Sequence, residues 1–385
     1  MGDIQSASQP FDSPVIASTG ERMISLDVFR GITIAGMIVV NNPGSWNYVY
    51  PPLAHAEWHG WTPTDLIFPF FLFIMGVAIP LAIRRRLARS ESQWAIWGHI
   101  VRRTVILFAL GLLLNGFPHF DLSRIRIPGV LQRIALCYFF AALIVMKTKV
   151  KGQAIAAVAL LAAYWAIMKL VPVPGYGAGI LEKEVNLASY LDSRLLSGHL
   201  YRPTWDPEGI LSTIPAIATT LLGVLTAHWL TSPRTMPKKV LGLIGAGIIG
   251  IVLGQVVNLW FPINKNLWTS SYALFTAGMA LLFLAACVWL VEVRGIRRPL
   301  VPFLIFGMNP ITVFVLSGLV ARLMVLYKVT RPDGTSVPLK TYLYETLFAS
   351  WAGPWQGSLF FALAYTMAWL APMAFLYRKR IFIKI

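Results

Sequence analysis

The densest group of chemically versatile side chains lies at residues 55–65, with the sequence His-Ala-Glu-Trp-His-Gly-Trp-Thr-Pro-Thr-Asp. A histidine in such a segment can act as a general base, because its reference pKa of about 6.5 lies near working pH. It can alternatively accept an acyl group covalently. His55 and His59 would share a face if the stretch were helical, but two histidines without a clear third ligand make a weak zinc site. We therefore expect acid–base or nucleophilic chemistry here, without a metal ion.

Asp65, at the end of this segment, has two open interpretations. Its carboxylate can cap the apolar helix that follows, because the positive end of a helix favours an acid. It can also contact a bound substrate. Both interpretations place Asp65 where a polar loop meets an apolar run.

Charged and amide side chains also occur inside apolar runs, where each costs roughly 3 kcal/mol and usually faces the protein interior. Asp27 and Arg30 lie three residues apart on one face of the first run, which ends at Asn41. They are expected either to form a buried ion pair or to line a central cavity. Asn309 precedes Pro310 in a later run, where a proline kink frees backbone groups and the amide suggests a ligand or helix contact.

The composition excludes an ordinary soluble domain. The chain has 385 residues, of which 57% are apolar and 13% are charged, whereas soluble domains carry about 25% charged residues. The formal charge of +17 would suggest nucleic-acid binding in a soluble protein. Here the Lys and Arg lie in short clusters between apolar runs, as in the loops of polytopic membrane proteins. We expect a protein of the lipid bilayer that does not bind nucleic acid.

Apolar runs of about 20 residues predict ten membrane-spanning helices. They are expected near 24–42, 64–83, 101–117, 127–146, 152–172, 208–231, 239–260, 269–292, 300–321 and 357–377. Two long polar connections, 173–207 and 322–356, interrupt the series. The sequence thus predicts an all-α integral membrane protein, with residues 1–22 as a disordered cytoplasmic tail and 23–385 as a single transmembrane domain.

The basic residues gather in alternate connections. Clusters at 84–89, 102–103, 147–151, 234–239, 294–298 and 378–384 fall on one side of the predicted membrane. Because cytoplasmic loops carry an excess of Lys and Arg, both termini are expected in the cytoplasm. The connections 43–63, 173–207, 261–268 and 322–356 then face outward. Asn41 and His55 are accordingly expected at the extracytoplasmic end of the bundle.

Several sequence blocks, in order, carry a family resemblance. They are Leu-Asp-Val-Phe-Arg-Gly at 26–31, Val-Asn at 40–41, His-Ala-Glu-Trp-His-Gly at 55–60, Asp-Leu-Ile-Phe-Pro-Phe-Phe-Leu-Phe-Ile-Met-Gly at 65–76, Arg-Ile-Pro-Gly-Val-Leu-Gln-Arg at 126–133, Asp-Pro-Glu-Gly at 206–209, Asn-Lys-Asn-Leu-Trp at 264–268 and Gly-Met-Asn at 307–309. Together they resemble the heparan-α-glucosaminide N-acetyltransferase family over about residues 22 to 320.

The resemblance implies a transmembrane acetyltransferase that moves acetyl from cytosolic acetyl-CoA to an amino sugar or glycan on the extracytoplasmic side. It implies a central acyl-CoA channel between the helices. The family's catalytic histidine falls on His55 and its catalytic asparagine on Asn41, while Arg30 and Arg133 are expected to bind the cofactor. Substrate-binding roles are expected for Asp65, Trp58, Glu208, Asn264, Asn266 and Asn309. The arginines at 84–86 and 102–103 either mark topology or pair with the nucleotide phosphates.

The chain departs from the lysosomal member of that family, which has a folded luminal domain before its first span and asparagine in place of His59. We therefore expect an envelope glycan, amino sugar or muropeptide as acceptor, and a multi-pass location in the inner (plasma) membrane. A transporter of sugars or cell-wall fragments is the alternative function. The wide apolar surface is compatible with a homodimer, although no motif specifies an interface.

Overall fold

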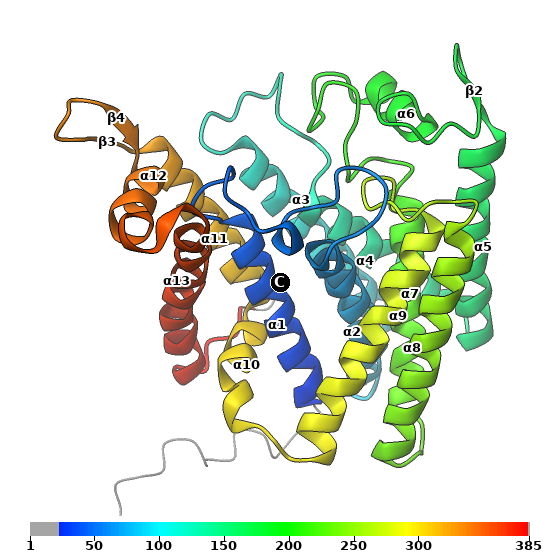
Figure 1. Cartoon of the computed structure of the whole chain (residues 1–385). Coiled ribbons are helices and arrows are strands. Elements are labelled where there is room, and N and C mark those ends of the chain that lie inside the picture. Colours follow the sequence, from blue (N-terminus) through cyan, green and yellow to red (C-terminus); the bar gives the residue numbers. More distant parts are fainter. Residues whose placement is uncertain (1–22, 384–385) are drawn as a thin grey trace, which may run out of the picture.

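The computed structural model describes residues 23–383 and consists almost entirely of helices (Figure 1). The tail expected at residues 1–22 lies outside the described residues. Within the described part of the chain, nine helical segments are long and apolar enough to cross a membrane, and a bent helix pair makes up to ten. The prediction of an all-α integral membrane protein with about ten spans is confirmed.

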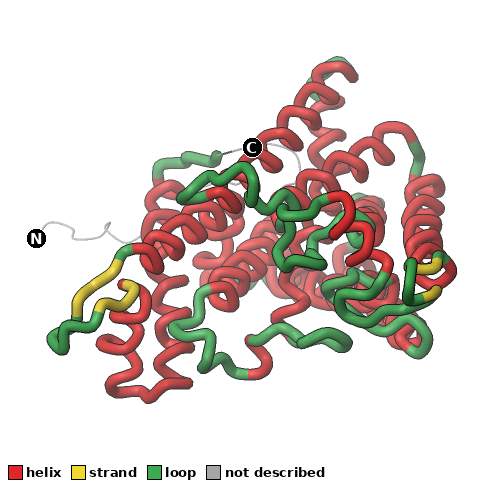
Figure 2. Tube along the Cα trace, turned by 90° about the horizontal axis from the view of Figure 1, so that it is seen from above, coloured by secondary structure: helices red, strands yellow, loops and turns green. Residues whose placement is uncertain are grey.

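The spans follow the predicted order. They are α1 (Ile24–Asn41), α2 (Ile67–Leu87), α3 (Gln93–Gly116), α4 (Val130–Lys147), α5 (Val150–Leu170), α7 (Thr213–Leu230), α8 (Met236–Asn258), α9 (Ser270–Val288), the bent pair α10 (Val301–Met308) and α11 (Pro310–Leu326), and α13 (Ser350–Arg378). Two short antiparallel strand pairs, β1 (Pro172–Val173) with β2 (Gly177–Ala178) and β3 (Lys328–Thr330) with β4 (Ser336–Pro338), lie at opposite edges of the bundle (Figure 2).

The two long connections are more ordered than polar loops. The segment 173–207 contains the β1–β2 pair and the helix α6 (Leu187–Leu195). The segment 322–356 is a loop only around the β3–β4 hairpin, because α11 extends to Leu326 and helix α12 (Leu339–Tyr344) begins soon after. Tyr344 is buried and donates a hydrogen bond to the Pro354 carbonyl, which fixes this aromatic-rich stretch against α13. The predicted outer loop 322–356 is thus much shorter than expected.

The break expected at Asn309–Pro310 is present, and the two helices there differ in direction by 75°. The buried Asn309 amide fills the break: its Nδ2 donates to the Ile381 carbonyl at 3.0 Å, and its Oδ1 accepts the Ile383 N–H at 2.8 Å. A proline at the start of α11 explains the interruption, because it cannot continue the hydrogen-bond ladder of α10. The C-terminal segment is thereby joined to the middle of the bundle.

Glycines bring the central helices into backbone contact. A Cβ at Gly31 of α1 would lie 1.7 Å from the Phe303 carbonyl oxygen of α10, and one at Gly76 of α2 would lie 2.0 Å from the Thr220 carbonyl oxygen of α7. Small residues allow this close approach in membrane helices. As a result α1, α2 and α7 form the buried centre, whereas most of α8 faces outward.

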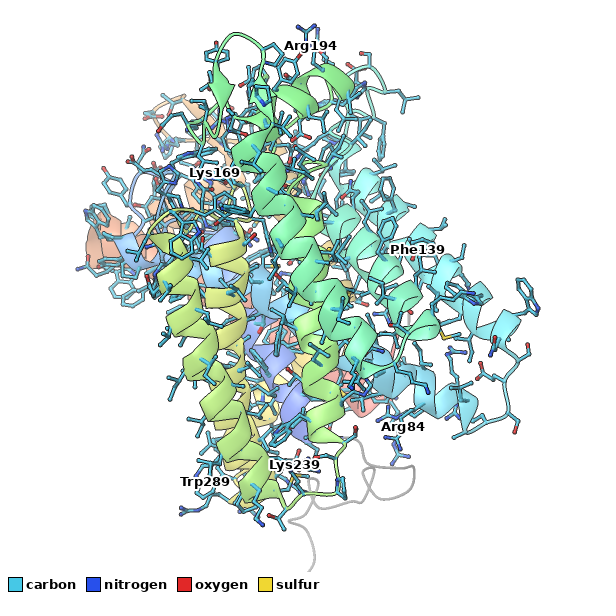
Figure 3. All side chains as sticks on the ribbon, turned by 90° about the vertical axis from the view of Figure 1, so that its right-hand side faces the viewer. Arg84, Phe139, Lys169, Arg194, Lys239 and Trp289 are labelled. Atoms are coloured by element: carbon cyan, nitrogen blue, oxygen red, sulfur yellow. The ribbon has the colours of Figure 1, made fainter. Side chains whose placement is uncertain are left out.

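The two ends of the bundle are distinct. Arg84 and Lys239 lie at one end, and Lys169 and Arg194 lie at the other (Figure 3). The loop 42–66 and helix α6 are at the second end, which we call the His55 end (Figure 1). The start of α1 and the end of α13 are at the opposite end (Figure 1). Which end faces the cytoplasm stays a prediction from the charge pattern.

Candidate active site

The loop 42–66 carries His55 across the mouth of the bundle and is anchored to two other connections. The Gly60 N–H donates to the Ile263 carbonyl at 2.8 Å, in a turn where Gly60 has a φ of 96° that favours glycine. The Trp58 indole donates to the Leu181 carbonyl at 2.9 Å. Because both anchors come from distant parts of the chain, the position of the imidazole depends on the whole His55 end.

His55 and Asp65 form a histidine–carboxylate pair, with 2.7 Å between His55 Nδ1 and Asp65 Oδ1. The Asp65 side chain is 1% exposed, whereas the His55 side chain is 49% exposed. The other oxygen of Asp65 accepts the backbone N–H groups of Ala56 and Thr62, each at 3.0 Å. Asp65 therefore caps the start of the second span, as one interpretation predicted, and also holds His55. When the ring proton is on Nδ1, where it is donated to Asp65, Nε2 is the hydrogen-bond acceptor on the exposed edge of the imidazole.

Lys265 completes this cluster. Its Nζ lies 3.0 Å from His55 Nδ1, 3.2 Å from His55 Nε2 and 3.5 Å from Asp65 Oδ1. Lys265 Nζ is nearly equidistant from the two ring nitrogens. In the ring plane it would overlap the Cε1 atom that lies between them. The ammonium therefore lies over the imidazole face. Burial lowers the pKa of Lys265 below its ordinary value, although the Asp65 charge opposes that shift. The His55 side chain is nevertheless half-exposed, so a ligand can reach it.

A cavity of about 720 Å³ opens beside this cluster. We call it the His55 cavity. It brings together four of the predicted site residues, which are His55, Asn41, Glu208 and Asn266, and Lys265 also lines it. The volume is within the range of small-molecule sites, roughly 300–1,000 Å³. Asn41 reaches it as the exposed last residue of α1.

Three other predicted substrate residues have structural contacts instead. Trp58 packs edge-on against Trp205 at 5.6 Å between ring centroids. The side chain of Asn264 is fully buried, and its Oδ1 accepts the Leu267 N–H at 2.9 Å within a turn. Asn309 lies at the α10–α11 break and does not line the His55 cavity. Their roles in substrate binding stay predictions that this geometry does not favour.

The two predicted cofactor ligands also lie outside the His55 cavity. Arg30 pairs with Asp27 at 3.1 Å and donates to the Gly307 carbonyl at 3.3 Å, so the ion-pair interpretation of the first span describes its contacts. Arg133 is 1% exposed, donates to the Gly209 carbonyl at 3.1 Å and to Ser212, and lies 5.2 Å from the Trp268 ring centroid. Arg133 thus supports the start of α7 from within.

Arg126 also lines the His55 cavity. Its guanidinium donates to Asp206 at 2.8 and 2.6 Å and also to Glu208. Burial alone would lower the pKa of Arg126, but the hydrogen bond to Asp206 and the charges of both carboxylates hold it above its ordinary value. The paired carboxylates fix the segment 206–209 over the cavity.

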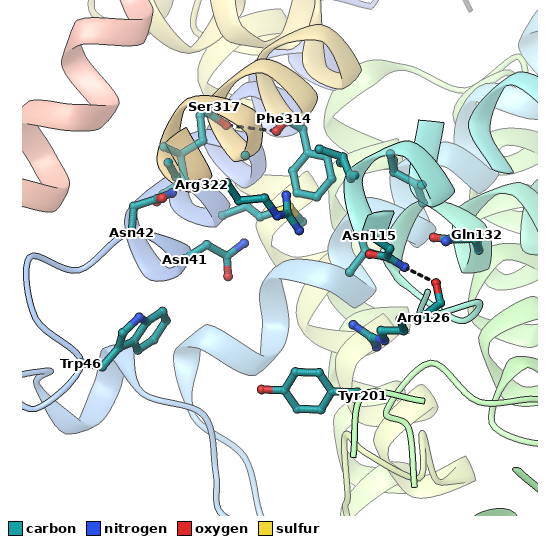
Figure 4. A pocket seen from close by; sticks show the side chains of 18 residues that line it. Asn41, Asn42, Trp46, Asn115, Arg126, Gln132, Tyr201, Phe314, Ser317 and Arg322 are labelled. Carbon is teal, nitrogen blue, oxygen red and sulfur yellow. Dashed lines mark hydrogen bonds between the residues drawn. The ribbon is translucent and has the colours of Figure 1, made fainter. Parts of the chain in front are cut away.

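A second cavity of about 490 Å³ adjoins the first and shares Asn41, Arg126 and Tyr201 with it. We call it the Arg322 cavity, after the arginine of α11 that extends into it (Figure 4). Farther along α1, apolar side chains of α1, α2 and α4, including Ile34, Phe71 and Ile134, leave a void of only about 10 Å³. Among the described residues, the predicted central channel is therefore narrowed by apolar side chains.

Sequence reasoning named His55 and Asn41, which the structure brings to one cavity, but did not name Lys265 and Arg126. A lysine or arginine in an outer connection is usually solvated, and Lys265 reaches His55 across 210 positions of sequence. Both residues stand inside blocks that carry the family resemblance, which was the available signal. Among residues 23–383, no group of three or more His, Cys, Asp or Glu side chains is placed to hold a metal ion.

Comparisons with known proteins agree with the resemblance. Residues 22–178 match the model of a domain of unknown function, DUF5009. The chain is 32% identical over 355 residues to the heparan-alpha-glucosaminide N-acetyltransferase of Mus musculus, covering 77% of this chain and 53% of that protein. It is 31% identical over 371 residues to the Homo sapiens protein of the same name, covering 82% of this chain and 54% of that protein.

This chain belongs to the heparan-alpha-glucosaminide N-acetyltransferase family. The family resemblance read from the motifs is confirmed. The chain spans about half the length of the curated relatives that it matches. The activity, substrates and partners of the family therefore enter for this chain as a proposal.

Proposed function

We propose that this protein is a membrane-embedded acetyltransferase, which moves acetyl from cytosolic acetyl-CoA to an amino sugar or glycan at the extracytoplasmic side. The observation that carries the proposal is the 2.7 Å contact between His55 Nδ1 and the buried Asp65, beside a cavity of ligand size. Membership of an N-acetyltransferase family supports the reaction class.

In the proposed reaction, His55 is the general base. An amino sugar at neutral pH is an ammonium ion, which first loses one proton to solvent so that its nitrogen can attack. Nε2 takes a second proton from the neutral nitrogen as it forms the new C–N bond at the thioester carbonyl. The C–S bond then breaks, and the proton on Nε2 passes to the departing thiolate of CoA. Asp65 holds the Nδ1–H throughout, which fixes the tautomer and stabilises the imidazolium.

Asn41 is proposed as the donor to the developing oxyanion. Its carboxamide lies at the end of α1 and lines the same cavity as His55. One such donor typically contributes about 10²–10³-fold to kcat, because it is aimed in advance at the oxygen that becomes negative.

The direction of transfer rests on the charge pattern of the connections. For acetyl-CoA to deliver its acetyl group from the cytoplasm, the pantetheine arm must pass the narrow region near Ile34 and Phe71. These apolar side chains would have to separate during the cycle. A closed passage at rest would also prevent ion leakage across the membrane.

The proposal is tested with the purified chain in lipid nanodiscs, supplied with radiolabelled acetyl-CoA and glucosamine. We expect labelled N-acetylglucosamine to form in proportion to the amount of chain, and no product with boiled chain. Absence of transfer to glucosamine and to amino-sugar-containing envelope fragments would exclude the acetyltransferase. Intact mass after acetyl-CoA alone separates the two routes, because only a two-step mechanism leaves an acetyl group on His55.

A transporter is the alternative that one observation favours. Interrupted membrane helices often form the substrate sites of transporters, and α10 and α11 are interrupted at Asn309. The Asn309 amide is, however, already bonded to the backbone at Ile381 and Ile383. Uptake of labelled glucosamine into proteoliposomes without acetyl-CoA would support the transporter.

A further inference from the structure

The Arg322 cavity differs from its neighbour in charge. Its described lining contains two guanidinium groups, Arg126 and Arg322, and no Asp or Glu. The His55 cavity is lined by Glu57, Glu184 and Glu208 in addition to basic residues. An anionic group placed between the two cavities would therefore be drawn toward the Arg322 side.

Arg126 is already neutralised, since its guanidinium is paired with both Asp206 and Glu208. Arg322, by contrast, has no ion pair or hydrogen bond to another side chain within residues 23–383. Figure 4 shows its guanidinium extending from α11 into the space that Asn41 and Asn115 border. A partly buried arginine without a partner is costly, which indicates that its partner is supplied by a ligand.

A second observation points the same way. Gln132 is 2% exposed and lines the Arg322 cavity, and its Nε2 has no hydrogen-bond partner in the part of the chain that the structure describes. Buried amide donors without a partner are rare in folded proteins and mark sites where water or a ligand binds. Gln132 and Arg322 come from α4 and α11, so donors converge on the cavity from different helices. Carboxylate and phosphate oxygens are the acceptors that suit such a set.

We propose that the Arg322 cavity is a subsite for an anionic group, carboxylate or phosphate, on the acceptor sugar. The inference rests on the proposed function and specifies its substrate class. The amine of the acceptor would lie beside His55, near the carboxylates that favour an ammonium ion, while its acidic substituent would contact Arg322. Asn41 lines both cavities, so the reacting nitrogen of the acceptor would lie between them.

The phosphates of acetyl-CoA are a second source of anionic groups. The cavity lies at the His55 end, and toward the opposite end the space narrows to the void of about 10 Å³. This placement favours the acceptor as the occupant. The experiment below distinguishes the two sources.

The test measures binding and turnover of three acceptors: glucosamine, glucosamine 6-phosphate and muramic acid, which is glucosamine with a carboxylate-bearing ether. Calorimetry in nanodiscs should show tighter binding of the two acidic sugars to wild type. Arg322→Gln should weaken their binding and lower their kcat/KM by about 10–100-fold, the usual effect of losing a charged hydrogen bond. Glucosamine should change by less than about twofold on the same scale. Arg322→Lys should restore part of the loss.

Arg194→Gln is the matched control, because it removes one positive charge at the His55 end from an exposed site outside both cavities. It should leave all three sugars unchanged. Equal losses for neutral and acidic sugars in Arg322→Gln would overturn the inference, as would a raised KM for acetyl-CoA with unchanged sugar binding. Arg322-dependent binding of acidic sugars without any transfer would instead uphold the subsite and contradict the acetyltransferase.

Discussion

The His55 cavity and the Arg322 cavity share Asn41 and Arg126, yet their other walls differ in kind. The first contains the His55 imidazole, the Asp65 carboxylate hydrogen-bonded to it, and the Lys265 ammonium over the ring. The second contains amides, aromatic rings and Arg322, which pairs with no side chain of residues 23–383. Groups able to exchange protons are thus concentrated on one side of Asn41, and groups able to bind an anion on the other.

This difference separates two kinds of loss that mutations should produce. Changes in the His55 cavity should lower the rate of the chemical step for every acceptor. Changes in the Arg322 cavity should discriminate between acceptors and leave the chemistry of a neutral sugar intact. If variants of both cavities affected neutral and acidic acceptors in the same way, the two cavities would act as one site.

The largest effect is expected from His55→Ala. Loss of the general base should lower kcat by about 10²–10⁴-fold with every acceptor, measured by transfer of labelled acetyl. His119→Ala is the control, because this exposed histidine lies outside both cavities. If the two variants retained equal activity, His55 would have no part in the reaction.

Asn41→Ala should follow, with kcat lowered by about 10²–10³-fold and the KM for the sugar little changed. The reason is that an oxyanion donor acts mainly in the transition state. Asn47→Ala, in the loop after α1 and outside both cavities, should behave like wild type. A purely elevated KM in Asn41→Ala would indicate that Asn41 binds the sugar and does not stabilise the oxyanion.

Lys265→Met should lower kcat/KM by about tenfold, because it removes the cation that lies 3.0 Å from His55 Nδ1 and 3.5 Å from Asp65 Oδ1. Transfer of labelled acetyl measures the loss. Lys265→Arg, which keeps the charge, should retain most of the wild-type activity. Wild-type activity in Lys265→Met would contradict a role for this cation in holding the pair of His55 and Asp65.

The smallest effect is expected outside both cavities, at Asp192. Burial raises the pKa of Asp192 to about 6, although the Ile210 N–H opposes that shift. Because the folded state favours the protonated carboxyl, its contribution to stability is full below the ordinary value of 3.8 and is lost as pH rises through about 6. Asp192→Asn should therefore be more stable than wild type at about pH 8, by at most about 3 kcal/mol, and equal to it at about pH 4.

Thermal unfolding followed by circular dichroism at both pH values measures this difference. Transfer activity should be unchanged, because Asp192 lines neither cavity. A loss of activity in Asp192→Asn would show that the α6 region contributes directly to the site.

The sequence predicted the spans, and it named several residues that the structure brings to one cavity, for identifiable physical reasons. Apolar runs must form helices in a membrane, so the order of α1 to α13 could be derived without tertiary information. His55 and Asn41 were found because their motifs resemble a family. Lys265 was missed because its contact with His55 depends on tertiary folding.

For Asn264 and Trp58, substrate binding stays a prediction that the geometry does not favour. Both are polar or amphipathic residues in connections predicted to face outward, where a ligand contact is a natural inference. In the structure, Asn264 bonds within its own turn and Trp58 bonds the Leu181 carbonyl. Local turn geometry and loop anchoring use the same side chains as ligand binding, and the sequence alone does not separate these uses. The loop predicted at 322–356 is shorter in the structure because apolar residues of this segment belong to helices, which the distribution of charged residues does not reveal.

A single-turnover experiment tests the central claim most directly. The protein is loaded with a substoichiometric amount of labelled acetyl-CoA, mixed with glucosamine and quenched over time, in wild type and in His55→Ala. The account predicts that wild type transfers the label to the sugar, while His55→Ala keeps it bound as intact acetyl-CoA. Transfer by His55→Ala at the wild-type rate would contradict the account, as would a wild type that binds acetyl-CoA without transferring the label.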